Sequence, residues 1–274
     1  MMRQSFFIFL FICVWTLHSC IPEMPVSSEI TVEGGLPGMP VNPMLYGITL
    51  EEANHAIDGG LYAELILNRS FEEGKTPPNC RYDRASNRLI TPNGWSIPFV
   101  RPDSIPGWKS VGSTYISLDE KEPINGVNKQ YLSVYNSGQS GRGGVIATGY
   151  DGITLKKGEK YDLEFYVKGS SFYAKTLYVS LQDSSLQTQV SDPLTTLITN
   201  GWKQVKHTFT ANKNINAGVL SFTTDSTAAF ALDDVSLFPQ SSYKNYRLRS
   251  DLFEHIQALQ PRFIRFPGGI FVEG

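Results

Sequence analysis

Residues 261–274 read P-R-F-I-R-F-P-G-G-I-F-V-E-G, and the fold that we predict for the chain depends on this stretch. The preceding stretch, 248–259, carries apolar residues at helical spacing, and Pro261 ends that predicted helix. Residues 262–266 then predict a short apolar strand, which runs into a Pro-Gly-Gly turn. Because ligand sites of α/β proteins gather where strands end, this turn predicts the lip of a binding site.

A second strand of this kind stands near the start of the chain. Residues 45–50 read L-Y-G-I-T-L, a nearly continuous apolar run that predicts a strand buried on both faces. Glu51 follows it directly, and the apolar spacing of residues 61–68 predicts a helix. The two outer pieces therefore read as one βα unit and the start of the next, which is too little to close a core alone.

Between the outer pieces the periodicity changes. Residues 77–105 are rich in Pro, Asn, Arg and Ser and predict irregular surface structure. Six later runs alternate as strands do, and turn signals such as Asn200-Gly201 separate them. The runs are 131–135, 161–167, 177–181, 202–209, 219–222 and 230–237. Several short strands in this order predict an antiparallel β-sandwich inserted between the outer pieces.

Residues 1–20 predict export. Arg3 and the apolar run 6–17 match a secretory signal, since a membrane span needs roughly 20 apolar residues. Residues 17–20, L-H-S-C, resemble a bacterial lipobox, which predicts lipidation of Cys20 and an exported lipoprotein in the periplasm or on the cell surface. The alternative is ordinary signal cleavage nearby, with Cys20 incidental. Only Cys80 then remains for the folded part, so we expect no disulfide and no zinc site.

Composition narrows the class of protein. A formal charge of −2 over 274 residues argues against nucleic-acid binding, and we expect membrane contact through the lipid anchor alone. Aromatic residues make up 12% of the chain beside 24 glycines and 16 prolines, a mixture that favours a β-rich, turn-rich fold.

The outer pieces together resemble a known enzyme family. Residues 45–55 (L-Y-G-I-T-L-E-E-A-N-H) with 58–72, and 248–253 with 261–274, resemble the two motifs of the α-L-arabinofuranosidases of glycoside hydrolase family 51. The type with an inserted carbohydrate-binding-like sandwich is the more similar. The resemblance implies a β-rich α/β fold, an incomplete (β/α)8 barrel (its first two strands) interrupted by an antiparallel jelly-roll or galactose-binding-like β-sandwich. The implied domains are a signal peptide (1–20), barrel residues (21–75), the insert (76–240) and a truncated continuation of the barrel (241–274).

The resemblance implies an exported retaining enzyme that releases terminal arabinofuranosyl units from arabinan or arabinoxylan. Its acid/base and nucleophile are two carboxylates about 5–5.5 Å apart. The family carries both on later strands, so we expect no catalytic residue before Gly274 and no activity from this chain alone. The alternative is a non-catalytic surface lipoprotein that binds arabinose-containing polysaccharides, although the outer motifs would be useless to a pure binding module.

The resemblance also assigns substrate-binding residues. Glu51 matches a glutamate that binds the arabinose unit. Arg265, in an otherwise apolar strand, matches an arginine beside the nucleophile, where a buried guanidinium needs a carboxylate partner. Gly268 and Gly269 match glycines that let the backbone approach the ligand closely. Ile270 departs from the polar residue or cysteine usual after this turn, which leaves fine specificity open.

Two features of the insert bear on ligands. Trp95, Trp108 and Trp202 are candidate sugar-stacking platforms, but tryptophans also fill sandwich cores, and Trp202 at a strand start favours the core. The pattern does not choose a platform among the three. Asp233 and Asp234 suggest a structural calcium, which needs several oxygen ligands; otherwise we expect no cofactor and no metal.

Overall fold

The computed structural model describes residues 28–32, 34, 38, 40–73, 76–77, 79–83, 85–99, 105–169, 175–243 and 246–267. The chain divides into two compact units, Met1–Asn42 and Pro43–Gly274. Among the described residues of the first unit, none lies in a helix or a strand. No helix within the described ranges is long and apolar enough to cross a lipid bilayer.

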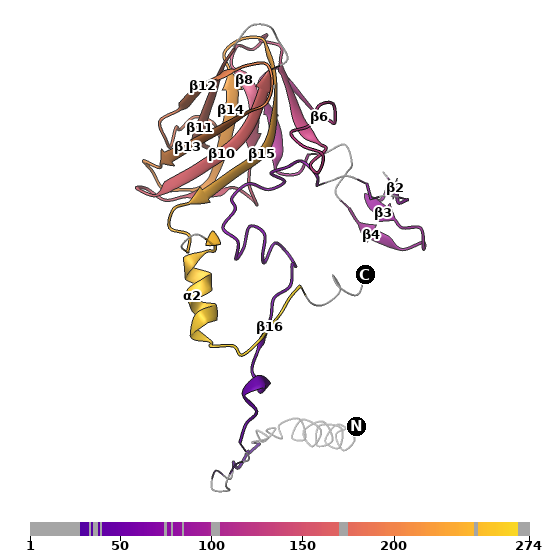
Figure 1. Ribbon diagram of the computed structural model, residues 1–274, viewed down its shortest axis with the longest axis vertical. Coiled ribbons are helices and arrows are strands. Elements are labelled where there is room, and N and C mark those ends of the chain that lie inside the picture. Colours follow the sequence, from indigo (N-terminus) through magenta and orange to yellow (C-terminus); the bar gives the residue numbers. More distant parts are fainter. Residues whose placement is uncertain are drawn as a thin grey trace, which may run out of the picture. The chain divides into compact units, whose positions relative to one another are not determined.

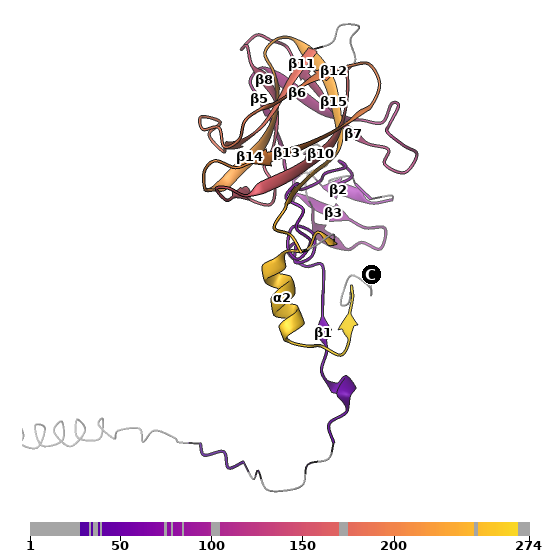
Figure 2. The ribbon, with the colours of Figure 1, turned by 60° about the vertical axis from the view of Figure 1, so that its left-hand side comes forward.

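The second unit contains a sandwich of two antiparallel sheets (Figures 1 and 2). In the described chain, one sheet has five strands and the other has six, with the short β9 pairing beside β14. The first sheet, in spatial order, is β13 (Lys203–Thr210), β10 (Lys160–Gly169), β15 (Ala228–Pro239), β7 (Tyr131–Asn136) and β6 (Thr114–Asp119). The second is β12 (Leu194–Ile198), β11 (Lys175–Asp183), β14 (Ile215–Thr224), β8 (Gly143–Ala147) and β5 (Trp108–Val111), with β9 (Ile153–Leu155). All six predicted runs overlap these strands, so the predicted sandwich is confirmed.

Aromatic side chains from both sheets meet in one core. Phe165 of β10 packs edge-on against Phe222 of β14, with ring centroids 5.1 Å apart, and this contact joins the two sheets. Trp108 of β5 lies 6.1 Å from Phe222 and 4.9 Å from Phe71. Each buried side chain of this size contributes roughly 1.5–3 kcal/mol. Phe71 and Ile66, although they precede the sandwich strands, therefore belong to its core.

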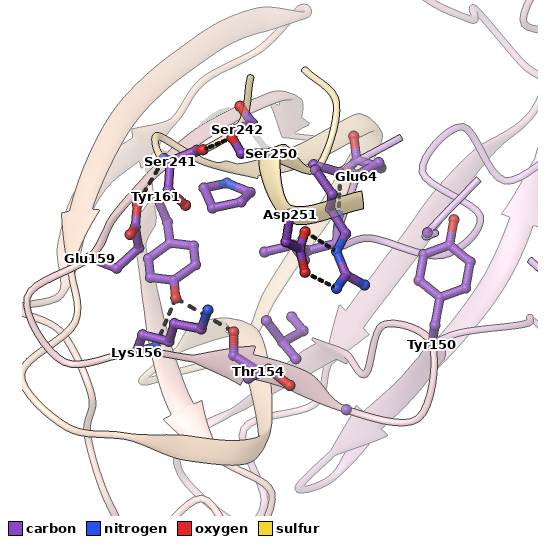
Figure 3. A pocket seen from close by; sticks show the side chains of 17 residues that line it. Glu64, Tyr150, Thr154, Lys156, Glu159, Tyr161, Ser241, Ser242, Ser250 and Asp251 are labelled. Atoms are coloured by element: carbon purple, nitrogen blue, oxygen red, sulfur yellow. Dashed lines mark hydrogen bonds and ion pairs between the residues drawn. The ribbon is translucent and has the colours of Figure 1, made fainter. Parts of the chain in front are cut away.

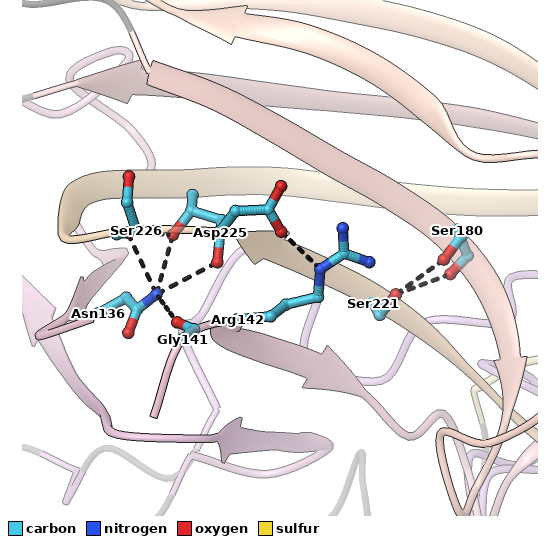
Figure 4. Close-up of polar contacts among 8 residues, drawn as sticks. Asn136, Gly141, Arg142, Ser180, Ser221, Asp225 and Ser226 are labelled. Atoms are coloured by element: carbon cyan, nitrogen blue, oxygen red, sulfur yellow. Dashed lines mark hydrogen bonds and ion pairs between the residues drawn. The ribbon is translucent and has the colours of Figure 1, made fainter. Parts of the chain in front are cut away.

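A buried amide fixes one end of the sandwich (Figure 4). Asn136, at the end of β7, has no exposed surface. Its Nδ2 lies 3.3 Å from the Gly141 carbonyl, 3.2 Å from that of Thr224 and 3.3 Å from that of Ser226. Its Oδ1 accepts the Gly138 N–H over 3.0 Å. Because both ends of the amide are bonded, this polar group is buried without an unmet hydrogen bond.

Residues 77–105 are not wholly irregular, contrary to the prediction. The strands β2 (Arg81–Asp83), β3 (Arg88–Ile90) and β4 (Ser96–Pro98) form a small antiparallel sheet. Strands of three residues contain too few alternations to stand out in a stretch rich in Pro and Asn, so the pattern missed them.

The predicted helix over 61–68 is also wrong. The backbone N–H of Ala63 donates to the Arg247 carbonyl over 2.8 Å, and that of Leu65 to the Leu237 carbonyl over 3.1 Å. These donors serve distant segments and not a helical ladder, and Asn68 adopts a left-handed φ of 55°. The apolar residues of 61–68 fall at helical spacing, but the segment is irregular and its backbone bonds to distant residues.

The outer strands are short and pair with each other. A 3₁₀ turn at Pro43–Leu45 precedes β1 (Ile48–Thr49), and α2 (Ser250–Ala258) precedes β16 (Ile264–Arg265). β1 and β16 run parallel, with Ile48 opposite Ile264. The expected burial of 45–50 on both faces is wrong, since Leu45 is 74% exposed. In the described chain β1 and β16 form a sheet of two strands only, and so small a sheet buries few of its own side chains.

Candidate functional site

The two outer motifs meet at the parallel pair β1–β16. The Ile48 N–H donates to the Phe263 carbonyl over 3.1 Å, and the Leu50 N–H donates to the Arg265 carbonyl over 2.9 Å. The Phe263 ring fills the space that a side chain at Gly47 would need, so glycine there permits the close approach. Since parallel strands end at the same edge, the residues after Leu50 and after Arg265 emerge side by side.

Glu51 stands at this edge beside a small hollow. The hollow measures about 290 Å³, and its walls come from the end of β1, the loop after it and one face of α2. Glu51 is exposed there. The neighbouring Glu52 has a different task, because its Oε2 accepts the N–H groups of Ile57 (3.1 Å) and Asp58 (2.9 Å). Glu52 therefore holds the loop that shapes the hollow, and Glu51 is the carboxylate presented at its rim.

Arg265 lies on β16, opposite Thr49 of β1. The expectation of a buried guanidinium is wrong for the described chain, since Arg265 is exposed. In the described chain β16 belongs to a sheet of two strands only, which is too small to bury a guanidinium. Gly268, Gly269 and the lipobox Cys20 lie outside the described residues.

A second hollow, of about 490 Å³, opens between the segment 59–65 and the start of α2 (Figure 3). Its wall includes Glu64. This residue lies within the helix predicted over 61–68, and no functional role was predicted for it. Glu64 is 1% exposed and accepts the Ser236 hydroxyl (2.7 Å) and the Leu237 N–H (2.9 Å) of β15, besides the N–H of Ile66 (3.1 Å). Burial raises the pKa of Glu64, although these donors oppose the rise. This carboxylate ties the segment after β1 to the sandwich.

The opposite side of this hollow is polar. Arg249 forms a two-pronged ion pair with Asp251, with Nη2 2.6 Å from Oδ2, which holds the Asp251 pKa low. The Tyr161 hydroxyl accepts the Lys156 N–H over 2.8 Å. On this side of the hollow, Arg249 and Asp251 satisfy each other, and so do the Tyr161 hydroxyl and the Lys156 N–H.

The three candidate tryptophans differ in environment. Trp108 is 4% exposed and donates its indole N–H toward the Leu67 carbonyl over 3.2 Å, as a core residue does. Trp202 is half-buried outside the core cluster, so the preference for a core position is wrong. Its ring meets Tyr131 edge-on at 5.3 Å, and the ammonium of Lys168 lies 4.9 Å from its centroid. Trp95 is 69% exposed.

Sequence reasoning missed an aromatic pair on the outer face of the five-stranded sheet. Tyr115 of β6 and Tyr135 of β7 lie directly opposite each other and are 73% and 46% exposed. On the other side of Tyr135, the residue directly opposite it on β15 is the small Ala229. Two open phenol rings next to a small residue offer stacking faces and hydroxyls to a flat ligand. The sequence signal for them was an aromatic residue at an outward position of each alternating run. Only the strand register shows that the two residues are neighbours.

Two buried side-chain oxygens, one of them at the bulge of β15, lack hydrogen-bond donors. Asp233 Oδ2 and Gln130 Oε1 receive no hydrogen bond from the described residues. Burial raises the pKa of Asp233 to about 7, and the neighbouring charges of Asp234 and Glu72 add to the rise. Within the described ranges, no three His, Cys, Asp or Glu side chains come together as metal ligands. A calcium ion here would therefore also need the Gln130 amide oxygen and backbone carbonyls, which suit its preference for oxygen.

The sandwich and the segment before it correspond to a known family. Residues 63–229 match the model of a carbohydrate binding domain, which is more than half of the chain. The chain belongs to this carbohydrate-binding domain family. The match includes Glu64, the sheet β2–β4 and the Tyr115–Tyr135 pair, whereas β1, α2 and β16 lie outside it.

Several α-L-arabinofuranosidases resemble the chain beyond this carbohydrate-binding domain. An extracellular exo-α-L-arabinofuranosidase of Streptomyces chartreusis is 35% identical over 89% of this chain and 26% of its own length. α-L-Arabinofuranosidase 2 of Arabidopsis thaliana is 35% identical over 86% of this chain and 33% of its own length. An arabinose-bound family 51 α-L-arabinofuranosidase superimposes with a TM-score of 0.67 at 25% identity, over 86% of this chain and 36% of its own.

These likenesses confirm the resemblance drawn from the outer motifs. They extend past the carbohydrate-binding domain, since they cover 86–89% of the chain. The chain spans about a quarter to a third of the length of the curated relatives it matches.

Proposed function

We propose that this chain serves an exported, retaining α-L-arabinofuranosidase that releases terminal arabinofuranosyl units from arabinan or arabinoxylan. It would contribute the carbohydrate-binding domain and the first substrate-binding edge of a (β/α)8 barrel. The observation that carries the proposal is the parallel pairing of β1 with β16, which brings Glu51 to the same edge as the residues after Arg265. A sandwich that only bound glycans would have no use for this edge.

The chemistry assigns different work to different residues. In a retaining glycosidase one carboxylic acid protonates the leaving oxygen while a carboxylate attacks the anomeric carbon, and water then hydrolyses the glycosyl-enzyme. We assign both groups to residues outside this chain. Glu51 would accept hydrogen bonds from hydroxyls of the arabinose unit, and Arg265 would keep the nucleophile ionised through its positive charge. Gly268 and Gly269 would let the backbone approach the sugar.

Hydrolysis of an aryl α-L-arabinofuranoside tests the assignment. The purified chain alone should release no arabinose, whereas a longer chain that adds the two catalytic carboxylates should release it. Proton NMR of the released sugar should show the α-anomer first, as retention requires. Turnover by the pure chain would contradict the placement of the catalytic carboxylates, and an inverted product would contradict the retaining mechanism.

The carbohydrate-binding domain supports a second contact with polysaccharide. We assign it to the outer face of the five-stranded sheet, where Tyr115 and Tyr135 stand exposed as a pair. The same face would serve the alternative function, a non-catalytic surface lipoprotein that binds arabinose-containing glycans. That alternative accounts for the sandwich but gives Glu51 and Arg265 no role.

Two further assignments accompany the proposal. The relative from Streptomyces chartreusis is named extracellular, which supports export of this chain, and residues 17–20 support a lipid anchor at Cys20. The orphan oxygens of Asp233 and Gln130, with the nearby acids Asp234 and Glu72, support a structural calcium in the carbohydrate-binding domain. Such an ion would neutralise buried charge and would take no part in hydrolysis.

A further inference from the structure

Trp95 is the one tryptophan of the described chain with most of its surface in solvent. Trp95 is 69% exposed, whereas Trp108 is 4% exposed. Ile97, two residues further along the chain, is 41% exposed. Leaving a large indole in water forgoes the gain of burying it, so an exposed tryptophan calls for an explanation.

The backbone holds Trp95 in a fixed place beside the turn that joins β3 to β4. Its carbonyl accepts the Thr91 N–H over 2.9 Å, and its N–H donates to the Thr91 hydroxyl over 3.1 Å. The Thr91 carbonyl accepts the Gly94 N–H over 2.9 Å, and Gly94 takes a φ of 80° that favours glycine. Pro92, between them, fixes its own φ. The turn is therefore set before any ligand arrives.

The strand after Trp95 is braced as well. The Arg88 guanidinium donates Nε–H to the Ser96 hydroxyl over 2.7 Å and a second bond to the Ser96 carbonyl. The Arg88 guanidinium is thus engaged with its own hairpin. Because these bonds fix the backbone around Trp95, a ligand that stacks on the indole costs little backbone entropy.

We propose that Trp95 is a stacking platform for the pyranose backbone of an uncharged polysaccharide, separate from the Tyr115–Tyr135 face. The inference rests on the proposed glycan-binding function, and the hairpin lies inside the matched carbohydrate-binding domain. One indole and one partly exposed Ile97 match the apolar face of a sugar ring. They fall far short of the roughly 800 Å² per partner that a stable protein interface buries. A second copy of the chain is therefore the poorer occupant.

Affinity electrophoresis through gels that contain soluble arabinoxylan or linear xylan tests the proposal. We compare the wild-type chain with Trp95→Ala, Trp95→Phe and Tyr246→Ala, the last a control because Tyr246 is also 69% exposed. Trp95→Ala should weaken binding about tenfold, as loss of an aromatic anchor does, and Trp95→Phe should recover part of it. Tyr246→Ala should bind as wild type, and circular dichroism should show all variants folded.

The outcomes separate this inference from the proposed function. If the wild type is retarded, Trp95→Ala is retarded equally, and Tyr115→Ala/Tyr135→Ala is not, the platform is overturned and glycan binding stands. If no polysaccharide retards the wild type, both are overturned. A Trp95→Ala chain that binds glycan normally but loses concentration-dependent self-association in size-exclusion chromatography would assign the indole to a second copy instead.

Discussion

The Leu50 N–H donates to the Arg265 carbonyl over 2.9 Å, and this bond joins two strands that bracket the whole sandwich in sequence. A backbone bond of this kind sets the parallel register, in which Thr49 stands opposite Arg265. The register in turn decides that Glu51 and the Pro267 turn leave the pair at the same edge. The carbohydrate-binding domain is thus inserted in sequence between two strands, β1 and β16, that remain paired with each other.

Glu51→Gln should weaken substrate binding in the active enzyme that contains these residues. A charged carboxylate that accepts hydrogen bonds from substrate hydroxyls contributes about 1.5–3 kcal/mol, so KM should rise roughly tenfold to a hundredfold. Steady-state kinetics on an aryl arabinofuranoside measure this. Glu254→Gln, on the exposed side of α2, is the matched control and should leave KM unchanged. Equal KM values for both variants would remove Glu51 from the site.

Glu64→Gln should destabilise the chain. Gln replaces one carboxylate oxygen by an N–H₂ group, so the Ser236 hydroxyl or the N–H groups of Leu237 and Ile66 lose an acceptor in a buried place. We expect a loss of about 1–3 kcal/mol in the free energy of unfolding.

Urea denaturation with Glu164→Gln as control measures the Glu64 effect. Glu164 forms a surface ion pair with Lys206 at 3.1 Å, and such pairs contribute about 0–1 kcal/mol. Two equally small losses would show that Glu64 does not tie the segment after β1 to β15.

Without calcium, stability should fall as pH rises from about 4 to about 7. The pKa of Asp233 is about 7 in the fold against an ordinary value of 3.8, so between these pH values the folded chain binds a proton that the unfolded chain has released. Calcium should take the place of that proton and raise the melting temperature more at pH 7 than at pH 5. Calcium at a hundred times its Kd would add about 2.7 kcal/mol.

Thermal melts with calcium and with a chelator check this. Asp233→Asn should flatten the pH dependence and abolish the calcium effect, whereas Asp192→Asn, an exposed position, should keep both. A wild-type melting temperature that calcium leaves unchanged at pH 7 would contradict the calcium assignment.

The sandwich was predictable because its strands are long enough to show their period. Residues 161–167 alternate through most of β10, and burial follows that alternation. The helix predicted over 61–68 failed because its donors bond to partners such as Leu237, far along the chain, which a local pattern does not reveal. For the same reason Glu64, whose partner Ser236 is 172 residues away, carried no sequence signal.

The sequence named candidate residues for the site, but it did not predict the surroundings of their side chains. The outer motifs pointed to Glu51, and the parallel pairing gives it a place at a strand edge. Burial of Arg265 was inferred from apolar neighbours in sequence, but burial depends on which strands lie alongside, and only β1 does so in the described chain. Tyr115 and Tyr135 needed the register of β6 and β7 before they became a pair.

Isothermal titration of the purified chain with arabinoxylan oligosaccharides tests the central claim, that this chain is the glycan-binding part of an arabinofuranosidase. We predict saturable heat with a micromolar to millimolar Kd, about 4–8 kcal/mol of binding free energy. Tyr115→Ala/Tyr135→Ala should weaken it at least about tenfold, since two stacking faces are lost. No saturable heat from a chain shown to be folded by circular dichroism would contradict the account.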